Sequence, residues 1–288
     1  MKILLTTHGA PHDEVALAFG AHIACRANEP ATVLSVVERA SDRPEAEAAL
    51  QRACELLQGS EVHTKIRTGQ VSREIIDEAE QGKYDLVIVG ERPNPNLLFR
   101  FLSGSDTIRV VEHAPCPVIV AKRKTGPIVR ILVCDSGAQG RLAELGPIVP
   151  ERPEAVPSLL ARFTAQLADL LQGEEEVTVL HVMSQISAAP GIKDKQLRAE
   201  AKELIEEHTP EGELLERDVR VLEQPGVHVW PKIRHGLVID EILAEAQAGR
   251  YDLVVIGAHR GAGWQRILLD DIAHKILVQM DRPVLVVR

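Results

Sequence analysis

The chain has 288 residues, of which 45% are hydrophobic and 26% charged, and its formal net charge is -9 at pH 7. This length favours two domains, and the negative charge argues against binding to nucleic acid or to an anionic membrane, which both need a basic surface. No stretch approaches the roughly 20 apolar residues of a membrane span. The four cysteines form no Cys-x-x-Cys pair, so we expect free buried thiols, no metal site and a cytoplasmic location.

The first half of the chain shows short apolar runs separated by helical patterns. Its strands are predicted near residues 2–7, 32–37, 61–67, 85–90 and 117–122. Strands that alternate with helices indicate βαβ units and a parallel sheet. We therefore assign residues 1–123 to a first domain, followed by a linker at 124–128.

The second half, residues 129–288, repeats this order with two insertions, near 138–157 and 184–217. Its strands are predicted near residues 129–135, 176–182, 218–223 (or on to 231), 252–257 and 283–288. The fold class is thus α/β, with two tandem open parallel five-stranded sheets that carry helices on both faces, as in nucleotide-binding proteins.

An internal repeat supports this division. Residues 69–90 and 236–257 align without a gap at a separation of 167 residues. Each block contains an amphipathic helix that is expected to stop at a glycine, Gly82 or Gly249, and then runs Tyr-Asp-Leu into a buried strand. Such self-similarity indicates a duplicated structural unit.

Ligands of open α/β sheets bind at the carboxyl ends of the strands, where the strand order reverses. The loops after strands one, two and four therefore hold the candidate ligand-binding residues. In the first domain these are Thr7, His8, Gly9, Val36 and Gly90.

The same three loops of the second domain supply its candidates. They are Asp135, Ser136, Gly137, Val182, Gly257, Arg260, Gly261 and Gly263. The insertion at 138–157 starts at this edge and contains four prolines, so we expect it to plug or cover the second site; the alternative is a surface loop.

Several segments resemble the universal stress protein family. The fourth strands, Asp-Leu-Val-Ile-Val-Gly at 85–90 and Asp-Leu-Val-Val-Ile-Gly at 252–257, are similar to the family's fourth strand. Residues 113–120, His-Ala-Pro-Cys-Pro-Val-Ile-Val, closely resemble its closing segment, and residues 281–288 are a looser version. The resemblance covers both halves outside the two insertions.

Nucleotide-binding members of this family carry Gly-x2-Gly-x9-Gly-(Ser/Thr) after strand four and an acidic residue at the end of strand one. In the first domain Gly90 matches the first glycine, Pro93 replaces the second, and Gly104-Ser105 supplies the closing pair. His8 stands where the acidic residue is expected. The resemblance thus implies a weakened ATP or AMP site, or, alternatively, a Ser105 that only caps its helix.

The second domain departs further from the motif. Arg260 takes the place of the second glycine, and Asp270-Asp271 replaces the closing Gly-Ser. Acidic residues at a helix start would occupy the anion position and repel a phosphate, since a like-charge pair at about 4 Å costs about 4 kcal/mol at an effective dielectric near 20. We expect no nucleotide cofactor there.

Family members commonly dimerise through the fifth strand, which is an exposed sheet edge. The resemblance therefore implies that Val118–Val120 and Val284–Val287 pair antiparallel within one chain, as an internal pseudo-dimer; a further homodimer of chains is left open.

The leading functional hypothesis is a stress-response protein that binds a small molecule or a protein partner without strong catalysis. The sequence shows no nucleophile–base–acid set and no metal-ligand pattern, so no catalytic residue is assigned. Two alternatives remain. One is an ATP- or AMP-binding regulator, with weak ATP hydrolysis, that uses the first domain, and the other is a carrier of a non-nucleotide ligand in the second domain.

Overall fold

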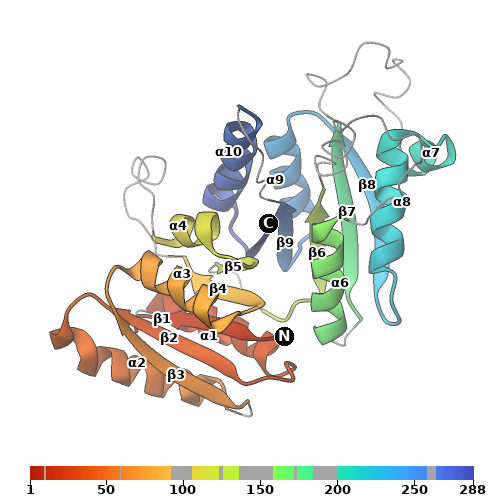
Figure 1. Cartoon of the computed structure of the whole chain (residues 1–288). Helices are drawn as coiled ribbons and strands as arrows, with labels where there is room; N and C mark the ends of the chain where they lie inside the picture. Colours follow the sequence, from red (N-terminus) through yellow and green to blue (C-terminus); the bar gives the residue numbers. More distant parts are fainter. Residues whose placement is uncertain are drawn as a thin grey trace. The chain divides into compact units, whose positions relative to one another are not determined.

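The computed structural model (Figure 1) describes most of the chain, with side chains in every described range except 11–12 and 264–271. The described ranges are 1–9, 11–58, 60–91, 106–122, 126–135, 158–171, 174–183, 200–257 and 264–288. The chain divides into two units. The first comprises Met1–Pro127 with Met280–Val286, and the second Ile128–Gln279 with Val287–Arg288.

The first unit follows the predicted alternation of strands and helices. Its elements are β1 Ile3–Thr7, α1 Pro11–Ala24, β2 Ala31–Val37, η1 Ala40–Asp42, α2 Arg43–Leu56, β3 Val62–Thr68, α3 Val71–Gly82, β4 Leu86–Gly90, α4 Asp106–His113 and β5 Val118–Ala121. Every residue of β1, β2, β4 and β5 is buried, as expected for parallel strands covered by helices on both faces.

The sheet of the first unit has the order β3-β2-β1-β4-β5-β10, in which β10 is Val284–Val287. Neighbours from β3 to β5 pair in parallel, whereas β10 pairs antiparallel with β5. The register joins Val284 to Val120, Leu285 to Ile119 and Val286 to Val118. This confirms the predicted intramolecular pairing of the two closing strands, and it adds a sixth strand to a sheet predicted to have five.

The second unit keeps the parallel order β9-β6-β7-β8. Its elements are β6 Arg130–Cys134, α6 Leu159–Leu171, β7 Glu176–Met183, α7 Ala201–Glu206, α8 Pro210–Leu222, β8 His228–His235, α9 Val238–Ala248, β9 Leu253–Gly257 and α10 Trp264–Gln279.

The strand predicted at 218–223 is wrong, because residues 218–222 end helix α8 and β8 begins only at His228. Of the longer alternative, which ran on to 231, only residues 228–231 lie in the strand. The helix has a strong start, since Pro210 occupies its first turn and Thr209 Oγ1 accepts a hydrogen bond from the Gly212 amide at 3.1 Å. Its buried side chains recur at helical spacing. Val219 and Val221 alternate with Asp218 and Arg220 as residues of a strand do, but capping and packing favour the helix.

Glycine is needed at the ends of α3 and α9 for a reason other than its usual role in a left-handed helix end. The left-handed residues are Lys83, with φ 51°, and Arg250, with φ 53°, rather than Gly82 or Gly249. A Cβ on Gly82 would lie 2.1 Å from the Tyr84 ring, and one on Gly249 would lie 2.2 Å from the Tyr251 ring. The close approach of an aromatic ring, and not backbone strain, therefore requires glycine at both helix ends.

The cysteines agree only partly with expectation. All four are free, and Cys116 and Cys134 are buried, but Cys25 at the end of α1 is exposed and Cys54 is half-buried. Among the described helices, none is long and apolar enough to cross a membrane.

The tyrosine contacts give a first prediction. Gly82→Ala should lower the free energy of unfolding by about 1–3 kcal/mol, because the Tyr84 ring must move, even though alanine favours helices over glycine. Gly126→Ala is the control, since no heavy atom lies within 4 Å of its added Cβ. Urea denaturation of the two variants measures the difference, and equal stabilities would contradict the ring-contact explanation.

Candidate functional site

The candidate site of the first unit begins where β1 ends. Thr7 is buried, and its Oγ1 accepts a hydrogen bond from the Gly9 amide at 3.2 Å. Gly9 has φ 83°, in the left-handed region that favours glycine. The His8 amide donates to Asp13 Oδ2 at 2.7 Å, and His8 Nδ1 lies 3.8 Å from the same oxygen. A buried carboxylate at the start of α1 therefore holds this turn in place.

Sequence reasoning placed His8 where an acidic residue is expected and did not consider Asp13. The signal was available, because Asp13 lies in the first turn of the helix that follows β1. Its carboxylate, with 3% of the residue exposed, is bonded to the turn itself. Asp13 thus stabilises the turn of the candidate site from within the protein.

A cation lies beside this turn. Arg52, from α2, places Nη2 3.1 Å from the position that a Cβ on Gly9 would take. Arg52 is exposed, and it forms no ion pair with any residue of the described part of the chain. A guanidinium at the carboxyl end of a parallel strand suits a carboxylate or phosphate ligand.

The other candidate residues of the first unit lie at the strand edge, within a strand, or outside the described residues. Gly90 ends β4 on the same edge of the sheet, and its carbonyl accepts a hydrogen bond from Thr107 Oγ1 at 3.4 Å. Val36 is buried within β2. Pro93, Gly104 and Ser105 lie outside the described residues, although helix α4 begins directly after them at Asp106.

At the matching place in the second unit, two carboxyl groups meet. Asp135 follows β6 with 6% of the residue exposed, and Asp218 of α8 is fully buried. Burial, then the hydrogen bond and negative charge of Asp135, raise the pKa of Asp218 to about 7. Ser158 donates to Asp218 from its amide, at 3.4 Å, and from its hydroxyl, at 3.0 Å.

The chemistry of this pair follows from its surroundings. Two adjacent buried carboxyl groups repel one another when both are ionised, so Asp218 keeps its proton up to near neutral pH. His181 Nδ1 lies 3.0 Å from the Asp135 carbonyl, and Arg217 Nε lies 3.4 Å from Asp218. The side-chain partner of Asp135 within the protein is thus Asp218. Sequence analysis missed Asp218 because the predicted strand at 218–223 placed it outside any helix.

The remaining candidates of the second unit do not form a described site. Val182 is half-buried near the end of β7, and a Cβ on Gly257 would lie 2.9 Å from Leu160 Cδ1, so α6 packs closely against this glycine. Ser136, Gly137, Arg260, Gly261, Gly263 and the 138–157 insertion lie outside the described residues.

The predicted helix start at Asp270-Asp271 is wrong. Helix α10 begins at Trp264, so both aspartates lie in its interior and not among the free amides of its first turn. Residues 264–269 are mostly long side chains that favour a helix, and they extend it toward the amino end. The predicted repulsion of a phosphate, which required these aspartates to lie at a helix start, is therefore wrong.

A buried glutamate network, missed by sequence analysis, occurs in both units. Glu78 accepts hydrogen bonds from Lys65 Nζ at 2.6 Å, Arg67 Nη1 at 2.9 Å and Tyr84 Oη at 3.1 Å. Burial alone would raise the pKa of Glu78, but the bonds from Lys65 and Arg67 lower it below its ordinary value.

Glu245 repeats this arrangement in the second unit. It accepts hydrogen bonds from Lys232 Nζ at 2.8 Å, Arg234 Nη1 at 2.9 Å and Tyr251 Oη at 2.8 Å. Its pKa is also lowered, because the bonds from lysine, tyrosine and arginine outweigh burial. The Lys-Ile-Arg at 65–67 recurs at 232–234, so extending the repeat a few residues upstream of Gly69 would have found both networks. Each network ties an outer strand to the following helix.

Fold and site together define the class: a duplicated parallel α/β protein with one candidate ligand position at the carboxyl edge of each repeat. The Universal stress protein family matches residues 1–122 and 158–288, which is most of the chain. This protein belongs to the universal stress protein family.

Solved structures and a curated relative agree with that assignment. A universal stress protein from Archaeoglobus fulgidus DSM 4304 is 19% identical, with a TM-score of 0.66 over 100% of this chain and 96% of its own. A putative universal stress protein from Pseudomonas aeruginosa UCBPP-PA14 is 20% identical, with a TM-score of 0.68 over 99% and 92%. These likenesses show the fold.

Universal stress protein MJ0531 of Methanocaldococcus jannaschii is 34% identical over 83 residues, which are 28% of this chain and 48% of the relative. This chain therefore spans about half the length of the curated relative that it matches. Another universal stress protein has been solved in complex with cAMP.

The buried glutamates give a second prediction. A carboxyl group whose pKa is lower in the folded state than in the unfolded state stabilises the protein at pH values above its unfolded-state pKa, about 4.3. This stabilisation is lost as the pH falls through the folded-state pKa. Glu78→Gln and Glu245→Gln should each cost about 2 kcal/mol at pH 7, and this cost should shrink below about pH 4.

Urea denaturation across pH measures this effect. The exposed Glu47→Gln is the control, since its pair with Arg43 lies on the surface and should contribute less than about 1 kcal/mol. A cost for Glu245→Gln that stays constant down to pH 3 would contradict the ionic origin.

The aspartate pair gives a third prediction with the opposite sign. Because the pKa of Asp218 is raised to about 7, the folded state binds more protons than the unfolded state from near pH 4 up to pH 7. The stability contributed by this group therefore falls as the pH rises through that window. In Asp218→Asn, the slope of the free energy of unfolding against pH in this window should change by the equivalent of about one proton. Parallel curves of unfolding free energy against pH for the variant and the unmodified chain would exclude a raised pKa at Asp218.

Proposed function

We propose that this universal stress protein binds a small anionic ligand, of the nucleotide class, in its first unit and acts without strong catalysis. The observation that carries the proposal is the exposed Arg52 guanidinium beside the Gly9 turn. Gly9 leaves the backbone free of a side chain there, and Thr7 and Asp13 hold the turn from within. A fixed turn with an available cation is a suitable position for a phosphate or carboxylate group.

The second unit has a different role in this proposal. Its acidic residue at the end of the first strand, Asp135, is already bonded to Asp218, and a phosphate would meet the negative charge that the pair shares. We propose that this position stabilises the fold and does not bind nucleotide. A non-nucleotide ligand in the second unit is less well supported, since Leu160 packs against Gly257.

The proposal of weak catalysis rests on the same groups. Each unit has carboxylates at the carboxyl edge, but Asp13 is bonded to the His8 amide and Asp218 to Ser158. Neither is arranged as a general base beside a free nucleophile.

A reducing cytoplasm suits the four unpaired cysteines.

Isothermal titration calorimetry with Mg-ATP, AMP and adenosine tests this function. Arg52→Glu should weaken ATP binding about tenfold or more and leave adenosine almost unchanged, because only the phosphates meet the guanidinium. Arg26→Glu is the control, since Arg26 is an exposed arginine at the end of α1. We expect turnover of bound ATP well below about 1 s⁻¹.

Two results would contradict the proposal. One is equal ATP affinity in the unmodified chain and in Arg52→Glu. The other is ATP binding that is lost in Asp218→Asn and kept in Arg52→Glu, which would move the site to the second unit.

A further inference from the structure

The helix between the second and third strands of each unit, α2 or α8, buries one face with the same spacing. Its buried side chains from residue 49 onward are Ala49, Leu50, Ala53 and Leu57, and those from residue 214 onward are Leu214, Leu215, Asp218 and Leu222. The two series match residue for residue. The buried Asp218 therefore stands at the position of Ala53, and Arg217, directly before it, stands at the position of Arg52.

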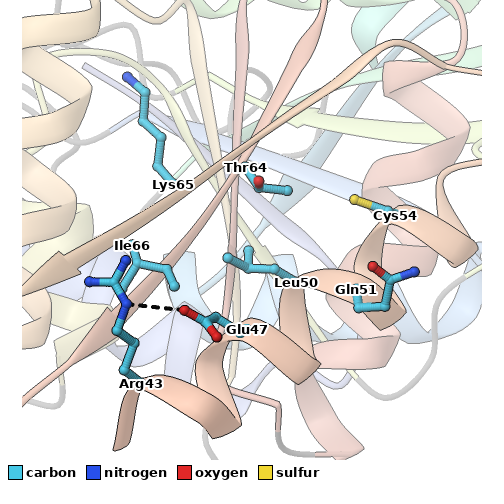
Figure 2. Close-up of a pocket in the computed structure, with 8 residues that line it drawn as sticks. All are labelled: Arg43, Glu47, Leu50, Gln51, Cys54, Thr64, Lys65 and Ile66. Atoms are coloured by element: carbon cyan, nitrogen blue, oxygen red, sulfur yellow. Dashed lines mark hydrogen bonds and ion pairs between the residues drawn. The ribbon is translucent and has the colours of Figure 1, made fainter. Parts of the chain in front are cut away.

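The matched face is the one that packs on the sheet. In Figure 2 the Leu50 side chain points from α2 toward Thr64 and Ile66 of β3. In the second unit α8 likewise turns the carboxyl group of Asp218 toward the end of β6, where it is hydrogen-bonded to Asp135. Residues at equal positions of the two helices thus face equal parts of their sheets.

The strand ends differ in the same way as the helices. The repeat matches Ile3-Leu4-Leu5 to Ile131-Leu132-Val133, so Thr7 at the end of β1 corresponds to Asp135 after β6. Both are buried. Where the first unit has a threonine and an alanine, the second therefore has two aspartates, while both units keep the arginine.

The two arginines consequently have different surroundings. Arg52 is exposed, with Nη2 3.1 Å from the position of a Cβ on Gly9. Arg217 has only 17% of its side chain exposed, and its Nε donates to Asp218 Oδ1 at 3.4 Å. Ser158 and Asp135 bind the same carboxyl group and hold it beside Arg217.

This difference decides what each guanidinium can bind. The N–H groups of an arginine that donate to a carboxyl group within the protein are not available to a phosphate. The negative charge of Asp135 also offsets the charge of Arg217 and repels an incoming anion, whereas Thr7 and Ala53 carry no charge. An unfavourable charge placed against one ligand is a common way to set selectivity.

We propose that Asp218, held in place by Asp135, occupies Arg217 and thereby determines that an anionic ligand binds the first unit and not the second. Arg217 is the second unit's counterpart of Arg52, kept from ligand by this internal contact. The choice of ligand rests on the function proposed above for the first unit, but the contact itself belongs to the second.

The test is a gain of binding in the full-length chain. Asp135→Asn combined with Asp218→Asn keeps the size of both side chains and removes both charges. Calorimetry should show the number of Mg-ATP bound per chain rising from one to two, with the second affinity within about tenfold of the first. NMR should show new ATP-dependent shifts at the amides of Val182 and Gly257.

A second double variant, Asp135→Thr with Asp218→Ala, copies Thr7 and Ala53 and should give the same gain, because it leaves no side-chain amide to hold Arg217. Adding Arg217→Glu to either double variant should remove only the second ATP. Adding Arg52→Glu should remove only the first. Urea denaturation confirms that each variant is folded.

One ATP per chain in both folded double variants would overturn the proposal, as would a second ATP that survives Arg217→Glu. The outcome is separable from that of the proposed function. An unmodified chain that binds no ATP, with double variants that bind one through Arg217, would contradict the function proposed for the first unit and support the role of Asp218.

Discussion

Parallel strands that are buried on both faces leave little room for polar chemistry, and this constraint organises the whole protein. The strands β1, β4 and β5 are entirely buried, so charged groups are confined to strand ends and to the outer strands. At the outer strands β3 and β8, one buried glutamate in each unit binds both a lysine and an arginine. A second glutamate, Glu74 or Glu241, also pairs with the arginine, so that two carboxylates balance two cations. At the carboxyl ends, the two units differ, with an arginine beside a short turn in the first unit and a pair of carboxyl groups in the second.

The duplication kept the support of the fold and changed the places where a ligand would bind. Glu78 and Glu245 bind the same three types of residue at the same spacing. The ends of β1 and β6 differ instead, with an exposed Arg52 beside Gly9 in one unit and a buried Asp218 beside Asp135 in the other. An unneutralised cation favours an anionic ligand, whereas Asp135 is hydrogen-bonded to Asp218 within the protein. The same fold can thus hold one ligand position and one structural counterpart.

The strand pattern was largely predictable because buried strands read directly as apolar runs between helices. Pairing of the closing strands, Val118–Val120 with Val284–Val287, followed from a family resemblance and is confirmed. The segment at 218–223 was misread because Val219 and Val221 imitate a strand, while the deciding signal, Thr209 with Pro210, lies about ten residues upstream.

The site was less predictable, because its groups come from distant parts of the sequence. Arg52 reaches Gly9 from α2, and Asp218 reaches Asp135 from α8, so neither contact has a local pattern. The helix start predicted at Asp270-Asp271 was wrong for a related reason. It was placed by matching a position of the family motif, whereas the helix-favouring residues from Trp264 onward start α10 earlier.

The central claim is that an anionic ligand enters the first unit at the end of β1 and does not enter the second. NMR chemical-shift mapping with Mg-ATP on the isotopically labelled full-length chain tests it most directly. The account predicts shifts at the amides of His8, Gly9 and Gly90 and none at Asp135, Val182 or Gly257. Shifts at the second group without the first would contradict it.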